Sequence, residues 1–474
     1  MINFFIRTYG CQANVADSQT LAEHLARLGC NEVGHEREAD LIILNTCAIR
    51  DKAEQKLWSY LGKLAAYKRI KPFLSIGIIG CVASYKKSEI YTRFDHVSFV
   101  YGAREDREVL HAYLADAVMR IQTAQQLFQS APESPLISGG QDRDVGALAK
   151  KLRLVPSYPK IPGVRMPSQE PCRSFINIMT GCNKYCSYCI VPFTRGREIS
   201  YPMSRILAQV EHDLAQGARE ITLVGQNVNS YKDPETGALF PELLRRVAVY
   251  EGDFWVRYMS PHPQDMTREL FEVMAAYRPK VAASLHFPVQ SGSDRILQLM
   301  NRTYLIDEYL TKIGWIRELM PDATISTDII VGFPGETEED FLQTMSVVDA
   351  VKFDLIYSFI YSPRAFTKAR AMSDDCSYEV KQQRLDRLQE RQTGIASQRN
   401  ALNIGKTLRC LVEKRLEHGK LLARTEGNIR VIIEGPDEYL GTFVPVLIET
   451  SGPANMHGKV VVDSLIRMTD TMAA

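Results

Sequence analysis

Short apolar runs alternate with longer amphipathic stretches over the first 121 residues. The apolar runs predict strands at Ile2–Thr8, Asp40–Asn45, Phe73–Ile79 and Val97–Val100. The stretches between them predict helices at Asp17–Leu28, Ala48–Ile70 and Glu105–Ile121. Strands that alternate with helices are typical of a parallel sheet with helices on both faces. We therefore predict an N-terminal doubly wound α/β domain over residues 1–121.

The same alternation returns after residues 122–172, where clustered prolines and glycines predict a linker. Strands are expected at Ser174–Met179, Glu220–Val224, Phe254–Met259, Val281–Phe287, Thr324–Val331 and Leu355–Tyr361. Helices are expected at Ser204–Gln216, Pro241–Tyr250, Thr267–Tyr277, Ile306–Met320, Thr337–Ala350 and Tyr378–Asn400. Six β/α units predict a partial TIM-like barrel over residues 173–402.

Residues 403–468 have a third pattern, in which short strands are separated by single glycines. The strands are predicted at Thr407–Glu413, Lys420–Thr425, Ile429–Ile433, Thr442–Thr450 and Gly458–Leu465. Five such strands fit a small closed β-barrel, a fold that often holds oligonucleotides. Basic and acidic residues nearly balance in this segment, so a docking or packing module is the alternative.

Composition indicates an ordinary globular chain of two to four domains. It has 474 residues, 45% hydrophobic and 24% charged. No apolar run is long enough for a membrane span, and the N-terminus lacks the features of a signal peptide. Ten cysteines without a secretory signal indicate a reducing cytoplasm and metal binding rather than disulfides. The net charge of only +1 does not by itself indicate a nucleic-acid binder.

The most informative motif is a loop with three cysteines, Cys182, Cys186 and Cys189, directly after the first predicted barrel strand. Structural zinc sites and electron-transfer iron–sulfur clusters usually take four protein ligands. Three thiolates leave one iron of a 4Fe–4S cluster open to another molecule. Active sites of such barrels lie at the carboxyl ends of the strands, where this loop is placed. Zinc with a remote fourth ligand and redox-active thiols are the alternatives.

A second set of cysteines, Cys11, Cys47 and Cys81, follows three predicted strands of the N-terminal domain. Ligands of open α/β sheets bind beyond the carboxyl ends of the strands, so these cysteines are expected to gather at one edge. The alternative is that they are small apolar residues that fill the core. We interpret Cys30, Cys376 and Cys410 as packing residues and leave Cys172 unassigned.

The cysteine loop in this context resembles the radical S-adenosylmethionine (SAM) enzymes, and the whole chain resembles their methylthiotransferase family. The motifs that carry the resemblance are Thr8–Asp17, Asn45–Gln55, Gly181–Gly196, Leu223–Tyr231, Pro288–Asp294 and Ser326–Thr337. The C-terminal barrel resembles the TRAM RNA-binding domain of that family. Two segments depart from the family pattern: Gly80–Tyr85 lacks the usual Ala-Gln-Arg after the third cysteine, and Tyr361–Thr367 has Ala-Phe where Pro-Gly is usual.

The resemblance implies SAM and two 4Fe–4S clusters, each held by one set of three cysteines. One cluster would generate a 5′-deoxyadenosyl radical, and the auxiliary cluster would deliver the sulfur. Asn45–Arg50 and Gln226–Asn229 are most similar to the branch that adds a methylthio group to C2 of N6-isopentenyladenosine beside the anticodon of tRNA. The other branches, which act on threonylcarbamoyl-adenosine in tRNA or on a ribosomal protein, are the alternatives. A non-catalytic zinc and RNA-binding protein is a third.

Several residues are candidates for the remaining roles, and no catalytic side chain is expected beyond the clusters. For SAM they are Gly225, Gln226, Gln290, Ser291 and Asp328, which lie at or near the ends of predicted barrel strands. For RNA they are Lys184, Arg195 and Arg197, although such cations are also common as solvated surface residues. Expected partners are the tRNA anticodon loop and an electron donor such as flavodoxin or ferredoxin. We expect a cytoplasmic monomer without membrane contact.

Overall fold

The computed structural model describes residues 1–48, 51–130 and 172–461, which form two compact units. The first unit contains the N-terminal segment together with Ile190–Gly196. The second contains the segment that ends at Cys189 and everything described from Arg197 onward. Most of the predicted linker, residues 131–171, lies outside the described residues. Each unit is described by itself below.

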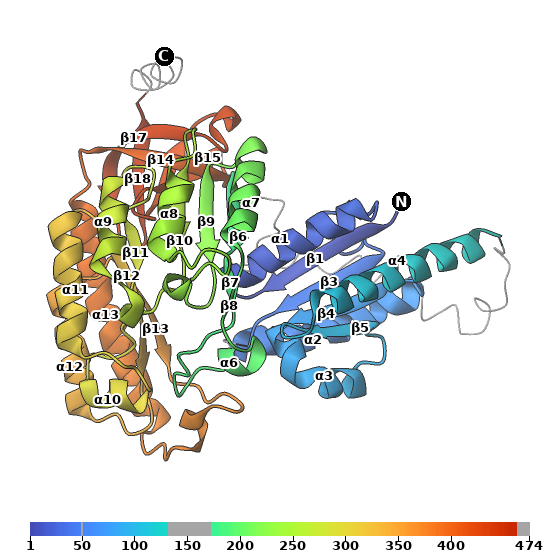
Figure 1. Ribbon diagram of the computed structural model, residues 1–474, viewed down its shortest axis with the longest axis horizontal. Helices are drawn as coiled ribbons and strands as arrows, with labels where there is room; N and C mark the ends of the chain where they lie inside the picture. The colour runs from blue at the N-terminus through green and yellow to red at the C-terminus, as the bar shows by residue number, and fades with distance from the viewer. Residues whose placement is uncertain (49–50, 131–171, 462–474) are drawn as a thin grey trace. The chain divides into compact units, whose positions relative to one another are not determined.

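The first unit is a parallel sheet of five strands in the order β2-β1-β3-β4-β5 (Figure 1). The strands are β1 (Asn3–Tyr9), β2 (Asn31–Glu32), β3 (Leu41–Thr46), β4 (Ser75–Gly80) and β5 (Phe99–Gly102). The helices are α1 (Gln12–Arg27), α2 (Asp51–Ile70), α3 (Cys81–Arg93) and α4 (Arg107–Ser130). Leu25 of α1 and Leu114 of α4 share one core with Ile43 of β3, whereas α2 and α3 cover the opposite face of the sheet. This arrangement confirms the predicted doubly wound domain.

Some elements of this unit were not predicted, and its last long helix extends past the predicted end. The two-residue edge strand β2 is too short to give a pattern. Helix α3 has only a short apolar face around Val82 and Ile90 and is kinked at Lys86. Helix α4 continues to Ser130, so residues 122–130 are helix and not linker.

The second unit contains the predicted partial barrel. Its parallel strands are β6 (Arg173–Asn177), β9 (Glu220–Val224), β10 (Trp255–Tyr258), β11 (Ser284–His286), β12 (Thr324–Val331) and β13 (Leu355–Ile360). The helices of the six units are α7 (Met203–Ala215), α8 (Phe240–Ala248), α9 (Arg268–Ala276), α11 (Ile306–Leu319), α12 (Glu338–Val351) and α13 (Tyr378–Ala401). A bridge between Val256 and Val281 joins the two groups of three strands, and β6 and β13 are left as open edges.

Several further short elements were not predicted. They are the ribbon of β7 (Met179–Thr180) and β8 (Ile199–Ser200), helix α10 (Asp294–Leu299) and, in the first unit, helix α6 (Val191–Thr194). Each has six residues or fewer, which is too short for a hydrophobic period to be recognised.

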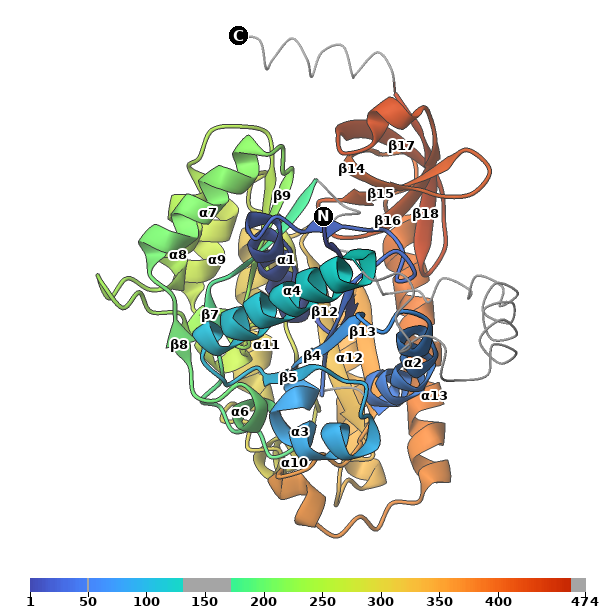
Figure 2. The same cartoon turned by 90° about the vertical axis from the view of Figure 1, so that its right-hand side faces the viewer.

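The chain ends in a closed five-stranded barrel in the order β14-β15-β16-β18-β17 (Figure 2). Its strands are β14 (Thr407–Arg415), β15 (Lys420–Thr425), β16 (Arg430–Glu434), β17 (Phe443–Ser451) and β18 (Asn455–Val460). Cys410 is fully buried in its core, and Cys172 packs with Trp255 and Leu411, so both cysteines have a packing role. Cys30 lies in the core of the first unit.

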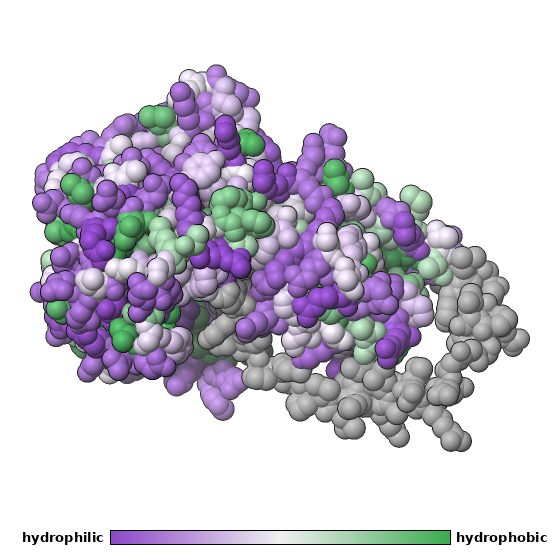
Figure 3. Space-filling model, turned by 90° about the horizontal axis from the view of Figure 1, so that it is seen from below, coloured by the Kyte–Doolittle hydropathy of each residue, from purple (hydrophilic) through white to green (hydrophobic). Residues whose placement is uncertain are grey.

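The surface is largely hydrophilic on the face drawn in Figure 3, where apolar residues form small patches separated by polar ones. None of the described helices has both the length and the apolar character that crossing a bilayer requires.

Candidate functional site

Three cysteines of the first unit lie at the carboxyl ends of neighbouring strands. Strands β1, β3 and β4 are adjacent and parallel. Cys47 directly follows β3, Cys81 directly follows β4, and Cys11 is the residue before helix α1. The predicted gathering of these cysteines at one edge of the sheet is therefore present.

A buried network of side-chain amides and hydroxyls joins the loops that carry these cysteines. The Asn14 amide donates to Asn45 Oδ1 at 2.8 Å and to the Thr46 carbonyl at 3.2 Å. The Asn45 amide donates in return to the Asn14 carbonyl and to Ser18 Oγ, both at 2.9 Å. Asn14, Ser18 and Asn45 are fully buried, and Cys11 Sγ donates to Asn14 Oδ1 at 3.4 Å. Because buried polar groups that are fully paired fix one arrangement, this network holds the cysteine loops in place.

Glycine precedes two of these cysteines because a side chain would not fit there. A Cβ on Gly80 would lie 2.5 Å from the Thr46 carbonyl oxygen, and Gly80 has a φ of +96°. A Cβ on Gly10 would lie 2.9 Å from Cys47 Cβ. The loops therefore approach each other more closely than other residues would allow.

The thiol of Cys11 is prepared to bind metal as a thiolate. Its hydrogen bond with Cys47 lowers the pKa of Cys11 to about 6, and the charge of Arg195 also lowers this pKa, against the opposing effect of burial. Within residues 1–48, 51–130 and 172–461, no three His, Cys, Asp or Glu side chains stand close enough to enclose a single metal ion. The cysteines of an iron–sulfur cluster bind different irons and therefore stand farther apart than the ligands of one ion. Three cysteines at one edge, with one thiol poised to ionise, fit such a cluster.

The CxxxCxxC loop lies in the second unit and is held by its neighbours at several points. The Gly181 N–H donates to Gln226 Oε1 at 2.6 Å. The Asn301 amide donates to the carbonyls of Lys184 and Tyr185 at 3.2 and 2.9 Å. Ser187 donates from its N–H to the Met300 carbonyl at 2.9 Å. Residues on both sides of the loop thus fix its path at the carboxyl ends of the strands.

A buried arginine, which sequence reasoning missed, contacts one of the loop cysteines. Arg302 Nη1 lies 3.6 Å from Cys186 Sγ, and Arg302 Nη2 donates to the Pro288 carbonyl at 2.7 Å. Its Nε donates to Tyr304 Oη at 3.2 Å. Arg302 is buried although its sequence neighbours Asn301 and Thr303 are exposed, so the local sequence gave no signal of its position. Burial raises the pKa of the Cys182 thiol to about 12, so ionisation there depends on a bound cation such as iron.

Three of the residues predicted to contact SAM, Gly225, Gln226 and Asp328, lie on or directly after barrel strands. Gly225 follows β9, and a Cβ on it would lie 2.5 Å from Met179 Cγ. The Gln226 side-chain oxygen accepts the hydrogen bond from the Gly181 N–H, so this side chain supports the cysteine loop. Asp328 Oδ2 lies 3.3 Å from His286 Nε2, and both residues are partly exposed on neighbouring strands.

Gln290 and Ser291 are buried and make hydrogen bonds within the fold. Ser291 Oγ accepts from the Ser293 N–H at 3.2 Å and lies 3.4 Å from Thr344 Oγ1, with no exposed surface. This hydroxyl fixes the start of α10 against α12. The Gln290 backbone, with a φ of +70°, pairs with β12 through hydrogen bonds at 2.8 and 2.9 Å.

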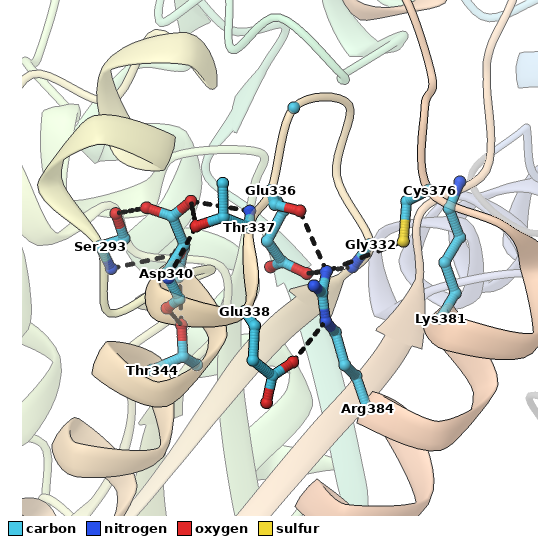
Figure 4. A network of polar contacts seen from close by, with 12 residues as sticks. Ser293, Gly332, Glu336, Thr337, Glu338, Asp340, Thr344, Cys376, Lys381 and Arg384 are labelled. Atoms are coloured by element: carbon cyan, nitrogen blue, oxygen red, sulfur yellow. Dashed lines mark hydrogen bonds and ion pairs between the residues drawn. The ribbon is translucent and has the colours of Figure 1, made fainter.

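The loop after β12 is braced from helix α13, as Figure 4 shows. The Gly332 N–H donates to Glu336 Oε2 at 2.7 Å, and Arg384 Nη1 donates to the same oxygen at 2.8 Å. A Cβ on Gly332 would lie 2.2 Å from Lys381 Cγ. Thr337 and Asp340 form a capping box, in which the Thr337 N–H donates to Asp340 Oδ2 at 2.8 Å.

The three cations predicted to contact RNA have different surroundings. Arg197 is exposed. Lys184 Nζ is bound by Asp265 at 2.7 Å and by Gln264 at 2.9 Å, at the surface of the second unit. The Arg195 side chain is only 6% exposed and is bound to Asp17 at 2.8 Å in the first unit. This burial argues against direct RNA contact by Arg195.

Comparison with known proteins matches the three parts of the chain in order. A model described as uncharacterized protein family UPF0004 matches residues 3–102, the radical SAM superfamily matches residues 176–348, and the TRAM domain matches residues 401–461. The tRNA-2-methylthio-N(6)-dimethylallyladenosine synthase of Aeromonas hydrophila is 40% identical over 96% of this chain and 91% of its own length. The protein of that name from Carboxydothermus hydrogenoformans is 38% identical over 97% of this chain and 99% of its own length. The chain belongs to the radical SAM methylthiotransferase family.

The fold of this family member is also similar to a solved radical SAM structure. The methyltransferase TsrM from Kitasatospora setae, solved with tryptophan and a SAM analogue, superposes with a TM-score of 0.53 at 13% identity. The match covers 78% of this chain and 75% of TsrM, which supports the fold. Radical SAM enzymes use a 4Fe–4S cluster and SAM, and Cys182, Cys186 and Cys189 lie within the matched segment.

Proposed function

We propose that this protein is a tRNA methylthiotransferase that adds a methylthio group to C2 of N6-isopentenyladenosine beside the anticodon. The observation that carries the proposal is the presence of two three-cysteine sets in one chain, each at the carboxyl ends of parallel strands. Relatives with the synthase name match nearly the full length of the chain.

The two cysteine sets would each hold a 4Fe–4S cluster. Cys182, Cys186 and Cys189 would hold the cluster that binds SAM, and Cys11, Cys47 and Cys81 the auxiliary one. When bound, these groups supply the electron that activates SAM and the sulfur that is transferred. Radical chemistry suits this substrate, because no general base could usefully remove a proton from an aromatic C–H at neutral pH.

Residues of the second unit would orient the bound groups. Gln226 and Asn301 fix the cysteine loop through its backbone, and Arg302 would hold the Cys186 thiolate. Gly225 would let the methionine part of SAM approach the backbone closely, since it carries no side chain. Asp328 and His286 would present a paired carboxylate and imidazole to the ribose hydroxyls. Gln290 and Ser291 would shape the site from within the fold.

RNA would contact the second unit through exposed cations and the C-terminal barrel. Arg197 is free to present its guanidinium to a phosphate. Lys184 would act together with Asp265, whose carboxylate holds its ammonium group in place. An anticodon loop suits such a site because its bases are unstacked and can be extruded. We further propose cytoplasmic action as a monomer, with a flavodoxin- or ferredoxin-like electron donor.

The test is anaerobic reconstitution of the full chain with iron and sulfide, followed by turnover with SAM and a reductant. The substrate is tRNA that carries N6-isopentenyladenosine, and the readout is mass analysis of digested nucleosides. We expect 2-methylthio-N6-isopentenyladenosine with the wild-type chain and none with Cys186→Ala. Product only on threonylcarbamoyl-adenosine tRNA, or only on a ribosomal protein, would overturn the proposed substrate. Stoichiometric zinc without formation of 5′-deoxyadenosine would overturn the reaction.

A further inference from the structure

The segment Ile190–Gly196 follows the CxxxCxxC loop in sequence but belongs to the first unit. It contains helix α6 and ends at a glycine with a φ of +81°. The chain thus passes from one unit to the other directly after Cys189, the last cysteine of the loop. The segment therefore follows one set of cysteines in sequence but belongs to the unit that contains the other set, Cys11, Cys47 and Cys81.

Two hydrogen bonds anchor the segment to the carboxyl edge of the N-terminal sheet. Ser84 Oγ donates to the Thr194 carbonyl at 3.0 Å, and Ser84 lies in the first turn of α3, the helix that begins at Cys81. Arg104 Nη1 donates to the Phe193 carbonyl at 3.2 Å. The same Ser84 oxygen accepts from the Ala103 N–H at 2.9 Å. The backbone next to Arg195 is therefore tied to the turn that carries an auxiliary cysteine.

The anchored segment also forms an ion pair with the helix that follows Cys11. Arg195 Nη2 lies 2.8 Å from Asp17 Oδ2, and the arginine side chain is 6% exposed while the aspartate is 27% exposed. Asp17 is on α1, the helix that begins after Cys11. The pair therefore connects the helix that follows Cys11 with a segment fixed to the helix that begins at Cys81.

The electrostatics agree with this placement. The Arg195 guanidinium is buried and interacts electrostatically with Asp17, Cys81 and Cys11. The guanidinium thus remains a fixed positive charge in a setting with little water. Charges in such settings interact more strongly than at the surface, because the effective dielectric constant is lower.

We propose that Arg195 is a positioning residue whose charge, held in place by Asp17, stabilises the electron-rich state of the auxiliary iron–sulfur site. The inference rests on the proposed function, since it requires that Cys11, Cys47 and Cys81 hold a cluster. Arg195 makes reduction of that cluster easier, and Asp17 makes it harder while fixing the arginine. Loss of Arg195 should therefore lower the reduction midpoint potential of the cluster, and loss of Asp17 should raise it.

The experiment uses the full chain with Cys182, Cys186 and Cys189 all replaced by alanine, so that iron binds only at the auxiliary site. Arg195→Gln and Asp17→Asn are each added to this background, and the cluster is titrated by electron paramagnetic resonance against potential. We expect Arg195→Gln to lower the reduced-to-oxidised ratio at fixed potential at least tenfold, or about 59 mV for one electron. Asp17→Asn should raise the ratio. Arg195→Lys should restore most of the wild-type value.

Arg120→Gln is the matched control, because Arg120 also pairs with a carboxylate, Asp116 at 2.7 Å, but is 79% exposed. It should leave the potential unchanged. Shifts in the same direction for Arg195→Gln and Asp17→Asn, or shifts no larger than that of Arg120→Gln, would overturn the proposal. If Arg195→Gln binds no iron, Asp17→Asn alone tests the proposal: a raised midpoint potential supports it, and a lowered or unchanged potential overturns it. Absence of an auxiliary cluster would be a distinct result, because the background variant itself would then bind no iron, and a different substrate would leave the potentials of these variants unaffected.

Discussion

Glu220, the first residue of β9, forms a buried ion pair with Arg424 of the C-terminal barrel, with 2.7 Å between Oε2 and Nη2. The Glu220 side chain has no exposed surface, and Arg257 at 2.8 Å and Arg173 at 3.0 Å also bind it. Arg424 in turn binds Glu413. Because Glu220 and Arg173 are the first residues of β9 and β6, the TRAM-like barrel is fixed to the end opposite the cysteine loop.

Removal of the Glu220 charge should destabilise this junction strongly. Glu220→Gln would leave three arginines without their shared carboxylate, and breaking a buried pair costs about 3–5 kcal/mol. We expect the free energy of unfolding of the second unit to fall by this amount. Urea denaturation followed by the fluorescence of Trp255, which packs at the same junction against Leu411, would measure it. The exposed Glu272→Gln should leave the midpoint unchanged, and equal effects of the two variants would refute the role of Glu220.

The same carboxylates should make the second unit sensitive to acid. Burial alone would raise the pKa of Glu220 and Glu413, but Arg424 and Arg173 hold both below the ordinary value of 4.5. Groups with a lowered folded-state pKa stabilise the fold above the unfolded-state pKa and lose this effect as the pH falls toward the folded value. The difference in free energy of unfolding between wild type and Glu220→Gln should therefore be largest at about pH 6 and should decrease below about pH 4.5. Urea titrations across this range test it, and a difference that does not vary with pH would contradict the assignment.

Arg302 should support the cleavage of SAM through its contact with Cys186. Arg302→Lys keeps the charge but loses the planar group that reaches Cys186, Pro288 and Tyr304 together. Hydrogen bonds to charged groups contribute about 1.5–3 kcal/mol, so we expect 5′-deoxyadenosine to form roughly ten- to a hundredfold more slowly. Iron content should stay near wild type. An Arg268→Lys variant on the exposed face of α9 is the control, and equal rates for both variants would exclude this role.

The auxiliary cysteines should account for half of the iron. With Cys11, Cys47 and Cys81 all replaced by alanine, reconstituted protein should hold about four irons per chain instead of about eight. The variant should still cleave SAM to 5′-deoxyadenosine but should add no methylthio group. Iron assay and nucleoside analysis measure the two effects. An unchanged iron content would show that these cysteines bind no cluster.

Sequence reasoning predicted the parallel sheet, the partial barrel and the C-terminal barrel because each has a hydrophobic period that extends over many residues. It could not place Arg302 or Arg195, because the role of each depends on contacts distant in sequence. Arg302 meets Cys186 only after the chain folds. Arg195 lies two residues before Arg197, and nothing in the local pattern shows that only Arg195 is buried, where it pairs with Asp17. The contact of Ser291 with SAM stays a prediction, and the sequence could not show that its hydroxyl accepts a hydrogen bond from the Ser293 N–H.

The most direct test of the central claim is the tRNA of a strain that lacks this gene. Digested tRNA should contain N6-isopentenyladenosine and no 2-methylthio-N6-isopentenyladenosine, and the wild-type gene should restore the methylthio nucleoside. The gene with Cys186→Ala should not restore it. Unchanged 2-methylthio-N6-isopentenyladenosine in the deletion strain, or full restoration by the Cys186→Ala gene, would contradict the account.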